Sequence, residues 1–508
     1  MQKINPLGLT ITAMIAMIAM IAMIMTSTMV NVAIPNIMGA FGVGQDQAHW
    51  ISTGFLSTMT AGMLLNGWLV ATFGPRNIFI ASLTFFSIAG VLGQYVSSFE
   101  AAVLARFAQG LCAGIIQPLA LSTVYLAYPP AQRGVAMGWF GLGIVFGPTI
   151  GPFLGGLIID QFEWRLLFSA TVPIMVVAAF MASIFMPGRD PDTKPVSLNV
   201  ISFILIITSI MLFLNGISSG QQNGWNTDSV FIMLFGAIVA LIIFLIRELK
   251  SKSPLLQLRL FRYRNYVASA LIAFIFGAGM FGSLYIIPVL VQTIQGFSAF
   301  KAGLMLLPGG IVSMIVFPIA GRLSTAVDPS HTIAVGLAIF GLSCWLLADI
   351  GMLTGFWVIA LLVAFGRIGL GLVMPSLNLS SMNSVPGDLV PYAAGTLNFI
   401  RMTGASIGVS VLAIIIDYRT TGYGADLLTT QTPDNTSTVE TLRMISQKLS
   451  HLGLNAEEGS LAAISYFKAL LSLKAQELAF QEGHVALCIL FMLGVIATTL
   501  LFRRKSDN

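Results

Sequence analysis

The stretch GLGIVFGPTIGPFLGG, from Gly141 to Gly156, lies inside a long apolar segment. Its glycines recur every four residues with two prolines among them, the set being Gly143, Gly147, Pro148, Gly151, Pro152 and Gly155. On a helix, residues four apart share one slowly drifting face, so this face would be bare backbone. Such a sequence would break a helix in water, whereas a bilayer tolerates it and small residues allow close helix packing there. The stretch therefore predicts a tightly packed membrane helix.

The composition of the whole chain also indicates a membrane protein. Of 508 residues, 56% are hydrophobic and 9% are charged, whereas soluble domains carry about 25% charged residues. The cysteines Cys112, Cys344 and Cys488 fall in separate apolar runs, and neither a CxxC pair nor a histidine cluster occurs. The sequence therefore predicts no disulfide framework, no metal site and no cofactor. Because the basic residues lie in short loops, they indicate topology and not a nucleic-acid partner.

About fourteen apolar segments have the roughly 20 residues that a membrane span needs. Basic residues, such as Arg76, Arg133 and Arg322, gather in the loops on one side. By the positive-inside rule, both termini are expected to face the cytoplasm. The membrane is expected to be a bacterial cell membrane. The first apolar run lacks a convincing cleavage site, so it is interpreted as a span and not as a signal peptide. The expected spans are 8–32, 50–71, 77–96, 101–126, 135–159, 165–186, 197–217, 228–247, 267–293, 302–323, 331–350, 354–376, 393–416 and 484–502.

Short patterns of the first half return in the second half at a nearly constant offset. Arg106 and Gly110 are echoed by Arg367 and Gly371. A glycine spacing is echoed too, with Gly138, Gly147 and Gly151 matching Gly395, Gly404 and Gly408. Parallel repeats of six spans are the layout of a bundle with a central substrate path.

The repeat divides the chain into three parts. Residues 1–190 are expected to form a six-helix bundle, 191–264 two inserted spans with a basic linker, and 265–508 a second six-helix bundle. A long extracytoplasmic loop is expected at about 418–483. Its second part is amphipathic, which predicts helices lying on the membrane surface or against the bundle.

Several motifs resemble one family. MVNVAIPNI (Met29–Ile37) is similar to a first-span signature, and LARFAQGLCAG (Leu104–Gly114) to a fourth-span motif. GWLVATFGPR (Gly67–Arg76) resembles the loop motif between spans two and three, and Gly141–Gly156 resembles the antiporter motif of span five. The chain therefore resembles the fourteen-span drug:proton antiporters of the major facilitator superfamily, the EmrB/QacA type, along nearly its whole length.

The resemblance implies a major facilitator fold and a secondary active exporter of hydrophobic or amphiphilic compounds, exchanging protons by alternating access. It assigns a conformational role to the glycines and prolines of Gly141–Gly156 and a gating role to the loop motif. The gate residues carried over are Gly67, Gly74 and Arg76. The candidates for the substrate path or for coupling are Arg106, Thr26, Asn31, Gln109, Arg367 and Arg401.

Two departures from the family pattern concern acidic residues. Thr26 and Ala71 stand where relatives usually carry aspartates, in the first-span signature and in the loop motif. The acids Asp349 and Asp417 lie near the outer ends of spans and are interpreted as solvated loop charges. The sequence therefore names no mid-membrane carboxylate for proton coupling.

Three arginines lie within predicted spans, where an ionised group is costly and faces the protein interior or a wet cavity. For Arg106 two interpretations stand side by side, a part in coupling and a structural brace. For Arg367 and Arg401 a structural brace is preferred. A central path with arginines and no acid would favour neutral or anionic amphiphiles over cations.

Two alternative functions remain open at this point. The chain could be the inner-membrane subunit of a tripartite pump that works with a periplasmic adaptor protein. It could also be a ligand sensor that has a transporter fold but moves no substrate. No catalytic constellation and no GxxxxGK[ST] motif occurs, so the sequence predicts neither an enzyme nor an ATP-driven pump.

Overall fold

The computed structural model describes residues 6–48, 50–189, 199–225, 227–251, 254–432, 434–451 and 455–501. These residues are overwhelmingly helical and contain no strand. Fourteen of the described helices are long and apolar enough to cross a membrane. The predicted all-α, fourteen-span architecture is thus confirmed.

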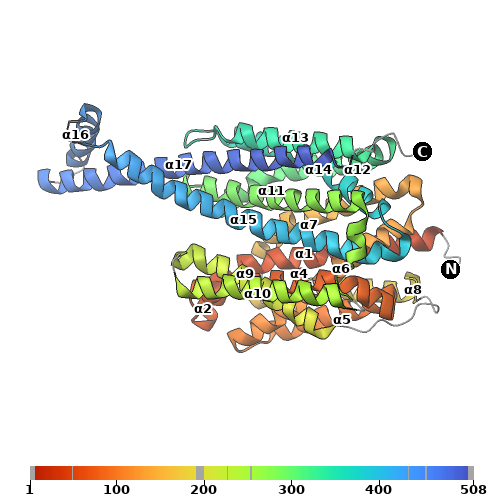
Figure 1. The fold of residues 1–508 in the computed structure, drawn as a ribbon. Helices are drawn as coiled ribbons and strands as arrows, with labels where there is room; N and C mark the ends of the chain where they lie inside the picture. The colour runs from red at the N-terminus through yellow and green to blue at the C-terminus, as the bar shows by residue number, and fades with distance from the viewer. Residues whose placement is uncertain are drawn as a thin grey trace.

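The first six spans form one bundle (Figure 1). Helix α7 packs along α1, α4 packs along α6, and α5 lies against α6 and α8. The spans are α1 (Pro6–Val32), α4 (Trp50–Phe73), α5 (Pro75–Gln94), α6 (Phe99–Ala127), α7 (Arg133–Gln161) and α8 (Val172–Phe185). Short helical segments join them, namely α2 (Ile34–Phe41), α3 (Gln45–Ala48), η1 (Pro130–Gln132) and η2 (Trp164–Phe168).

The last six spans form a second bundle, in which α11 packs on α15, α12 and α13 pack on α14, and α13 packs on α17. They are α11 (Arg264–Thr293), α12 (Ala299–Ala326), α13 (Pro329–Leu347), α14 (Phe356–Asn383), α15 (Val390–Thr429) and α17 (Ala456–Thr498), with η3 (Leu258–Arg262) before α11 and η4 (Gly387–Leu389) before α15. Between the bundles, α9 (Val200–Asn223) and α10 (Asp228–Lys250) pair with each other, and α9 lies on α4 and α15.

The glycine face of α7 packs on α1. A Cβ placed on Gly147 would lie 2.9 Å from Ile24 Cγ2, and one placed on Gly151 would lie 2.0 Å from Thr28 Oγ1. Helix α7 continues through both prolines as one helix. The bare backbone therefore allows an approach that side chains would block.

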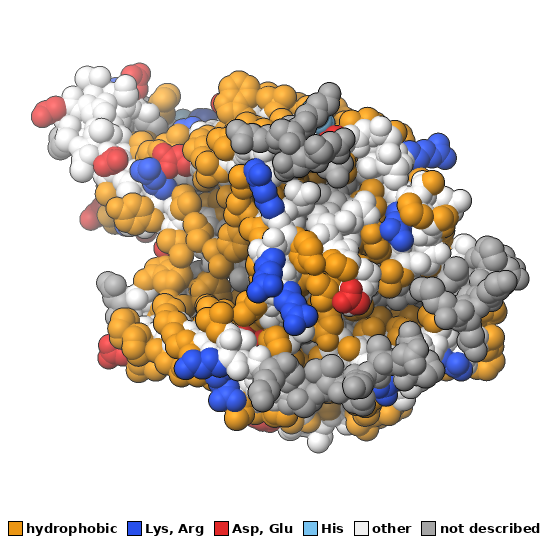
Figure 2. Space-filling view, turned by 45° about the vertical axis from the view of Figure 1, so that its right-hand side comes forward, with side chains coloured by type: hydrophobic (Ala, Val, Ile, Leu, Met, Phe, Trp, Pro, Cys, Tyr) orange, Lys and Arg blue, Asp and Glu red, His pale blue; other side chains and the backbone are white. Residues whose placement is uncertain are grey.

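The flanks of the molecule are apolar, as a lipid-facing surface requires. Exposed Phe, Leu, Ile and Val side chains line α9 and α10, among them Phe231 and Leu249. Hydrophobic side chains also dominate the flank seen in Figure 2, whereas Lys and Arg lie across the end that turns forward. Because both chain ends lie there (Figure 1), we call it the termini end and the opposite one the far end.

At the far end the helices run beyond the bundle. Helix α15 has 40 residues and α17 has 43, and α16 (Thr436–His451) packs on α17. The extension projects away from both bundles (Figure 1) and carries polar and charged side chains (Figure 2). The predicted amphipathic helices are therefore present, but one is the separate helix α16 and the other continues α17 outward, instead of lying against the bundle. Their charged surfaces favour water over a packed position.

Candidate functional site

The two bundles are joined by hydrogen bonds at the termini end. Tyr125 at the end of α6 donates from its hydroxyl to Asn383 Oδ1 at the end of α14, over 2.7 Å. Arg133 Nη1 donates to the same hydroxyl over 2.9 Å, and its guanidinium lies 4.1 Å from the centre of the Tyr125 ring. Asn66 Nδ2 on α4 donates to the carbonyl of Pro391 on α15 over 2.8 Å. Two of these bonds tie α6 and α4 of the first half to the second half, and the bond from Arg133 on α7 supports Tyr125.

Backbone-to-backbone packing seals the same end between α7 and α12. A Cβ placed on Gly134 would lie 2.2 Å from the carbonyl oxygen of Gly321, and one placed on Gly321 would lie 2.5 Å from that of Gly134. One turn further on, a Cβ placed on Gly138 would lie 2.5 Å from the oxygen of Phe317. Side chains at these glycines would wedge the halves apart, so glycine is required for this contact.

The predicted gate residues divide between two places. A Cβ placed on Gly67 would lie 2.1 Å from Tyr392 Cδ1, so this glycine touches the other half. Gly74 has φ +82° and packs against the backbone of Arg189 within its own half. Arg76 is half-buried in the first turn of α5. The sequence pointed to Gly67, but no motif pointed to the hydrogen-bonded residues that cross between the halves.

Further along the same two helices, a cavity of about 120 Å³ lies between α7 and α12. Its walls are almost entirely apolar and include Leu142, Phe146, Ile150, Leu307, Ile311 and Met314. The contacts between the halves, with this apolar cavity beyond them, describe a conformation closed at the termini end.

Arg106 lies buried inside the first bundle and joins α6 to α4. Its Nε donates to the carbonyl of Ile51 over 3.3 Å, its Nη1 donates to Gln109 Oε1 over 3.2 Å, and its guanidinium lies 4.1 Å from the centre of the Phe55 ring. Gln109 continues the network by donating from Nε2 to the carbonyl of Phe168 over 2.9 Å. Among the described residues Arg106 Nη2 has no partner. This geometry is that of a brace between helices.

Arg367 and Arg401 are buried in the second bundle. Arg367 packs on α12, where a Cβ placed on Gly309 would lie 2.9 Å from its Cγ. Arg401 Nη2 donates to Asn398 Oδ1 on its own helix, and its backbone lies against Gly277 of α11. Among the described residues, no carboxylate forms an ion pair with any of the three arginines. None of the three lines the apolar cavity between α7 and α12.

Thr26 takes a structural position in the first bundle. It is fully buried, donates to the carbonyl of Ala22 over 2.9 Å, and lies 2.8 Å from the hydroxyl of Thr171 just before α8. The threonine thus links α1 to α8 where relatives are expected to carry an acid. The side chain of Asn31 lies outside the described residues.

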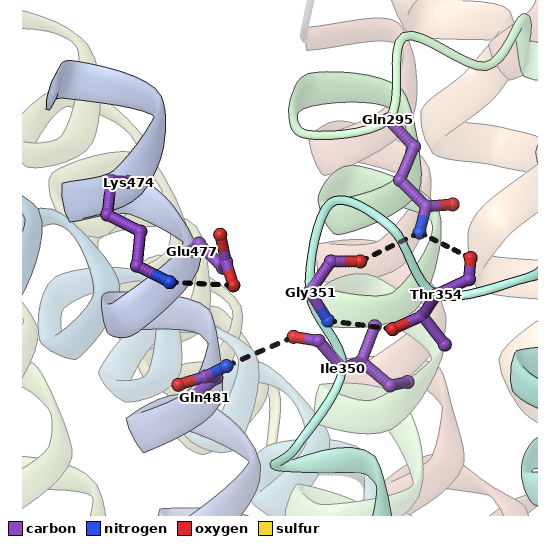
Figure 3. Close-up of polar contacts among 7 residues, drawn as sticks. All are labelled: Gln295, Ile350, Gly351, Thr354, Lys474, Glu477 and Gln481. Carbon is purple, nitrogen blue, oxygen red and sulfur yellow. Dashed lines mark hydrogen bonds and ion pairs between the residues drawn. The ribbon is translucent and has the colours of Figure 1, made fainter. Parts of the chain in front are cut away.

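A polar cluster at the far end holds α17 against the α13–α14 loop (Figure 3). Gln481 donates to the carbonyl of Ile350 over 3.3 Å. Gln295, after α11, donates to the carbonyls of Gly351 and Thr354, each over 3.0 Å. We call these residues the far-end clamp, because they join three segments of the second half.

Two bundles of like topology that meet through close contacts at the termini end define the class of secondary transporters that work by alternating access. The chain belongs to the Major Facilitator Superfamily, whose sequence profile matches residues 16–409. It is 29% identical over 453 residues to the MFS-type transporter YhcA of Bacillus subtilis, covering 89% of this chain and 84% of YhcA. It is 27% identical over 441 residues to the multidrug export protein EmrB of Escherichia coli, covering 86% of this chain and 85% of EmrB.

A solved structure agrees on the fold. The human organic anion transporter MFSD10 superimposes with a TM-score of 0.62 at 14% identity, covering 96% of this chain and 99% of MFSD10. At that identity the likeness concerns the fold alone.

Proposed function

We propose that the protein is a secondary active exporter of hydrophobic and amphiphilic compounds in a bacterial cell membrane. The observation that carries the proposal is that the halves are closed at the termini end with an apolar cavity beyond the closure. Tyr125 and Gly134 hold the halves together at the termini end, and the cavity lies between α7 and α12 further along. The relative EmrB is a multidrug export protein, which supports the same direction and substrate class.

The orientation follows from charge. Lys and Arg side chains spread over the termini end (Figure 2), and cytoplasmic loops carry an excess of these residues. We therefore place both termini in the cytoplasm, which makes the sealed end the cytoplasmic gate and the conformation outward-facing. The first six spans and the last six would then rock about the central path, with α9 and α10 beside them.

The expected preference for neutral or anionic substrates stays a prediction. It requires arginines on the central path, and Arg106, Arg367 and Arg401 are buried in this conformation. The apolar walls at Phe146 and Ile311 favour hydrophobic substrates, whether these carry a positive charge, a negative charge or no charge. Proton antiport rests on the family resemblance, and neither Thr26 nor Ala71 can supply the usual acid.

Transport into inverted membrane vesicles, whose outer face is the cytoplasmic one, tests the proposal. A lipophilic cationic dye and an anionic amphiphile are added outside the vesicles in parallel assays, with and without a collapsed pH gradient. Export that stops when the gradient collapses supports antiport, and export that survives excludes it. Ligand binding without transport of either compound would contradict the exporter and favour the sensor.

One observation favours an adaptor-linked variant of the same function. The extension of α15, α16 and α17 projects away from the two bundles at the far end (Figure 1), where a periplasmic adaptor would have access to it. Co-purification of a membrane-fusion partner that is lost when 430–455 is replaced by a short linker would support this variant. Full export by the shortened chain in proteoliposomes would contradict it.

A further inference from the structure

A second cavity, of about 290 Å³, opens at the far end where the inserted helices meet the second bundle. Four segments contribute its walls. They supply Trp225 between α9 and α10, Tyr285 on α11, Asp417 on α15, and Gln476 and Phe480 on α17. Its volume is close to the lower limit of small-molecule sites, which is about 300 Å³.

The charge of this cavity is negative and unbalanced. The carboxylate of Asp417 forms no hydrogen bond or ion pair with a described residue. The bases nearest in sequence to the cavity residues of these two helices are already matched, since Arg419 Nε lies 2.6 Å from Glu482 Oε2 and Lys474 Nζ lies 3.0 Å from Glu477 Oε1. Asp417 is exposed to solvent, and no base paired with it in the described structure offsets its attraction for an incoming cation.

Three aromatic side chains line the same cavity as this charge. Trp225, Tyr285 and Phe480 come from three different segments and share one cavity with Asp417. Aromatic faces attract organic cations through the ring quadrupole, and a carboxylate adds direct charge attraction. Gln476 adds a polar group that can accept a hydrogen bond from a protonated amine.

The wall formed by α17 is held in place. Glu477 and Gln481 face the α13–α14 loop, where Gln481 belongs to the far-end clamp (Figure 3). Their neighbours Gln476 and Phe480 face the cavity on another side of the helix. The clamp therefore fixes the rotation of α17 and with it the position of the Phe480 ring, which reduces the ordering cost of binding.

We propose that this cavity binds a monovalent organic cation, a quaternary ammonium or protonated amine that carries an apolar group. Asp417 supplies the counter-charge, and Trp225, Tyr285 and Phe480 supply the aromatic cage. Asp417 is solvent-exposed, as expected from the sequence, and in this proposal it also serves as the counter-charge of a ligand. The site lies outside the path between α7 and α12, and the proposal concerns binding alone.

Isothermal titration of the full chain in phosphatidylcholine nanodiscs tests the site, with benzyltrimethylammonium as the probe. Asp417→Asn is expected to weaken binding by about tenfold, because removing a partly solvated charge contact costs roughly that factor. Trp225→Leu is expected to weaken it by about threefold or more. Asp417→Glu keeps the charge and is expected to retain most of the affinity. Benzylsulfonate, the anionic analogue, is expected not to compete.

The matched control is Asp426→Asn, on the same helix but outside the cavity, which is expected to bind like the parent protein. Equal weakening by both substitutions would assign the effect to diffuse surface charge and overturn the site. Equal binding of benzylsulfonate would overturn it as well. Each variant is compared by size-exclusion profile, and Asp417→Glu shows whether loss reflects charge or folding. Because no gradient is applied, a failure of export leaves this result intact, and a failure of this site leaves the exporter intact.

Discussion

At the scale of single residues, the Tyr125 hydroxyl holds the gate closed, since it accepts a hydrogen bond from Arg133 and donates one to Asn383. Tyr125→Phe removes both bonds, each with a net value of about 1 kcal/mol. We expect the gate to open in a several-fold larger share of molecules. Spin labels at Gln132 and Ala326 should report a longer distance across the gate.

The matched control for that variant is Tyr128→Phe. Tyr128 contacts Arg133 through its main-chain oxygen, over 3.2 Å, so loss of its hydroxyl should leave the gate distance unchanged. If both variants widen the gate equally, the Tyr125–Asn383 bond does not hold it closed.

Substitution of Arg106 can distinguish the two interpretations of this residue, a structural brace and a part in coupling. Arg106→Lys keeps a positive charge but loses the planar fork that reaches Ile51 and Gln109. If the residue is a brace, we expect the free energy of unfolding to fall by about 2 kcal/mol, seen as a lower melting temperature in detergent, with export falling in proportion. Loss of export at an unchanged melting temperature would instead support a role in coupling.

At the scale of elements, the close packing of the glycine face of α7 on α1 depends on residues without side chains. Gly151→Ala places a methyl group 2.0 Å from Thr28 Oγ1 and 2.9 Å from the oxygen of Met25. Overpacking of this kind costs about 1–3 kcal/mol, so thermal unfolding should begin at a lower temperature. Gly156→Ala on the same helix meets nothing within 4 Å and should behave like the parent. An unchanged Gly151→Ala protein would show that α7 and α1 can separate freely.

The glycine face of α7 also shows what sequence alone can predict. Glycine spacing and apolar length are local, so the α7 face and the fourteen spans follow from the chain directly. The Tyr125–Asn383 bond joins distant positions and exists only in one arrangement of the halves, which no local pattern encodes. Asp417 resembles a loop charge in the sequence because its aromatic neighbours come from other segments. The missing acid draws attention to Thr26, but its hydroxyl contact with Thr171 exists only in the packed bundle.

At the scale of the whole molecule, the two bundles should move as rigid bodies, because Gly134 and Gly321 meet through backbone that cannot yield locally. Gly321→Ala inserts a methyl group at this contact and should favour the conformation in which the gate is open. Rocking about a central path then requires opposite changes at the two ends. The distance between labels at Gln132 and Ala326 should lengthen while that between labels at Asp160 and Lys301 shortens. If the gate widens and the far-end distance stays fixed, the halves bend locally, and alternating access by rigid rocking is wrong for this chain.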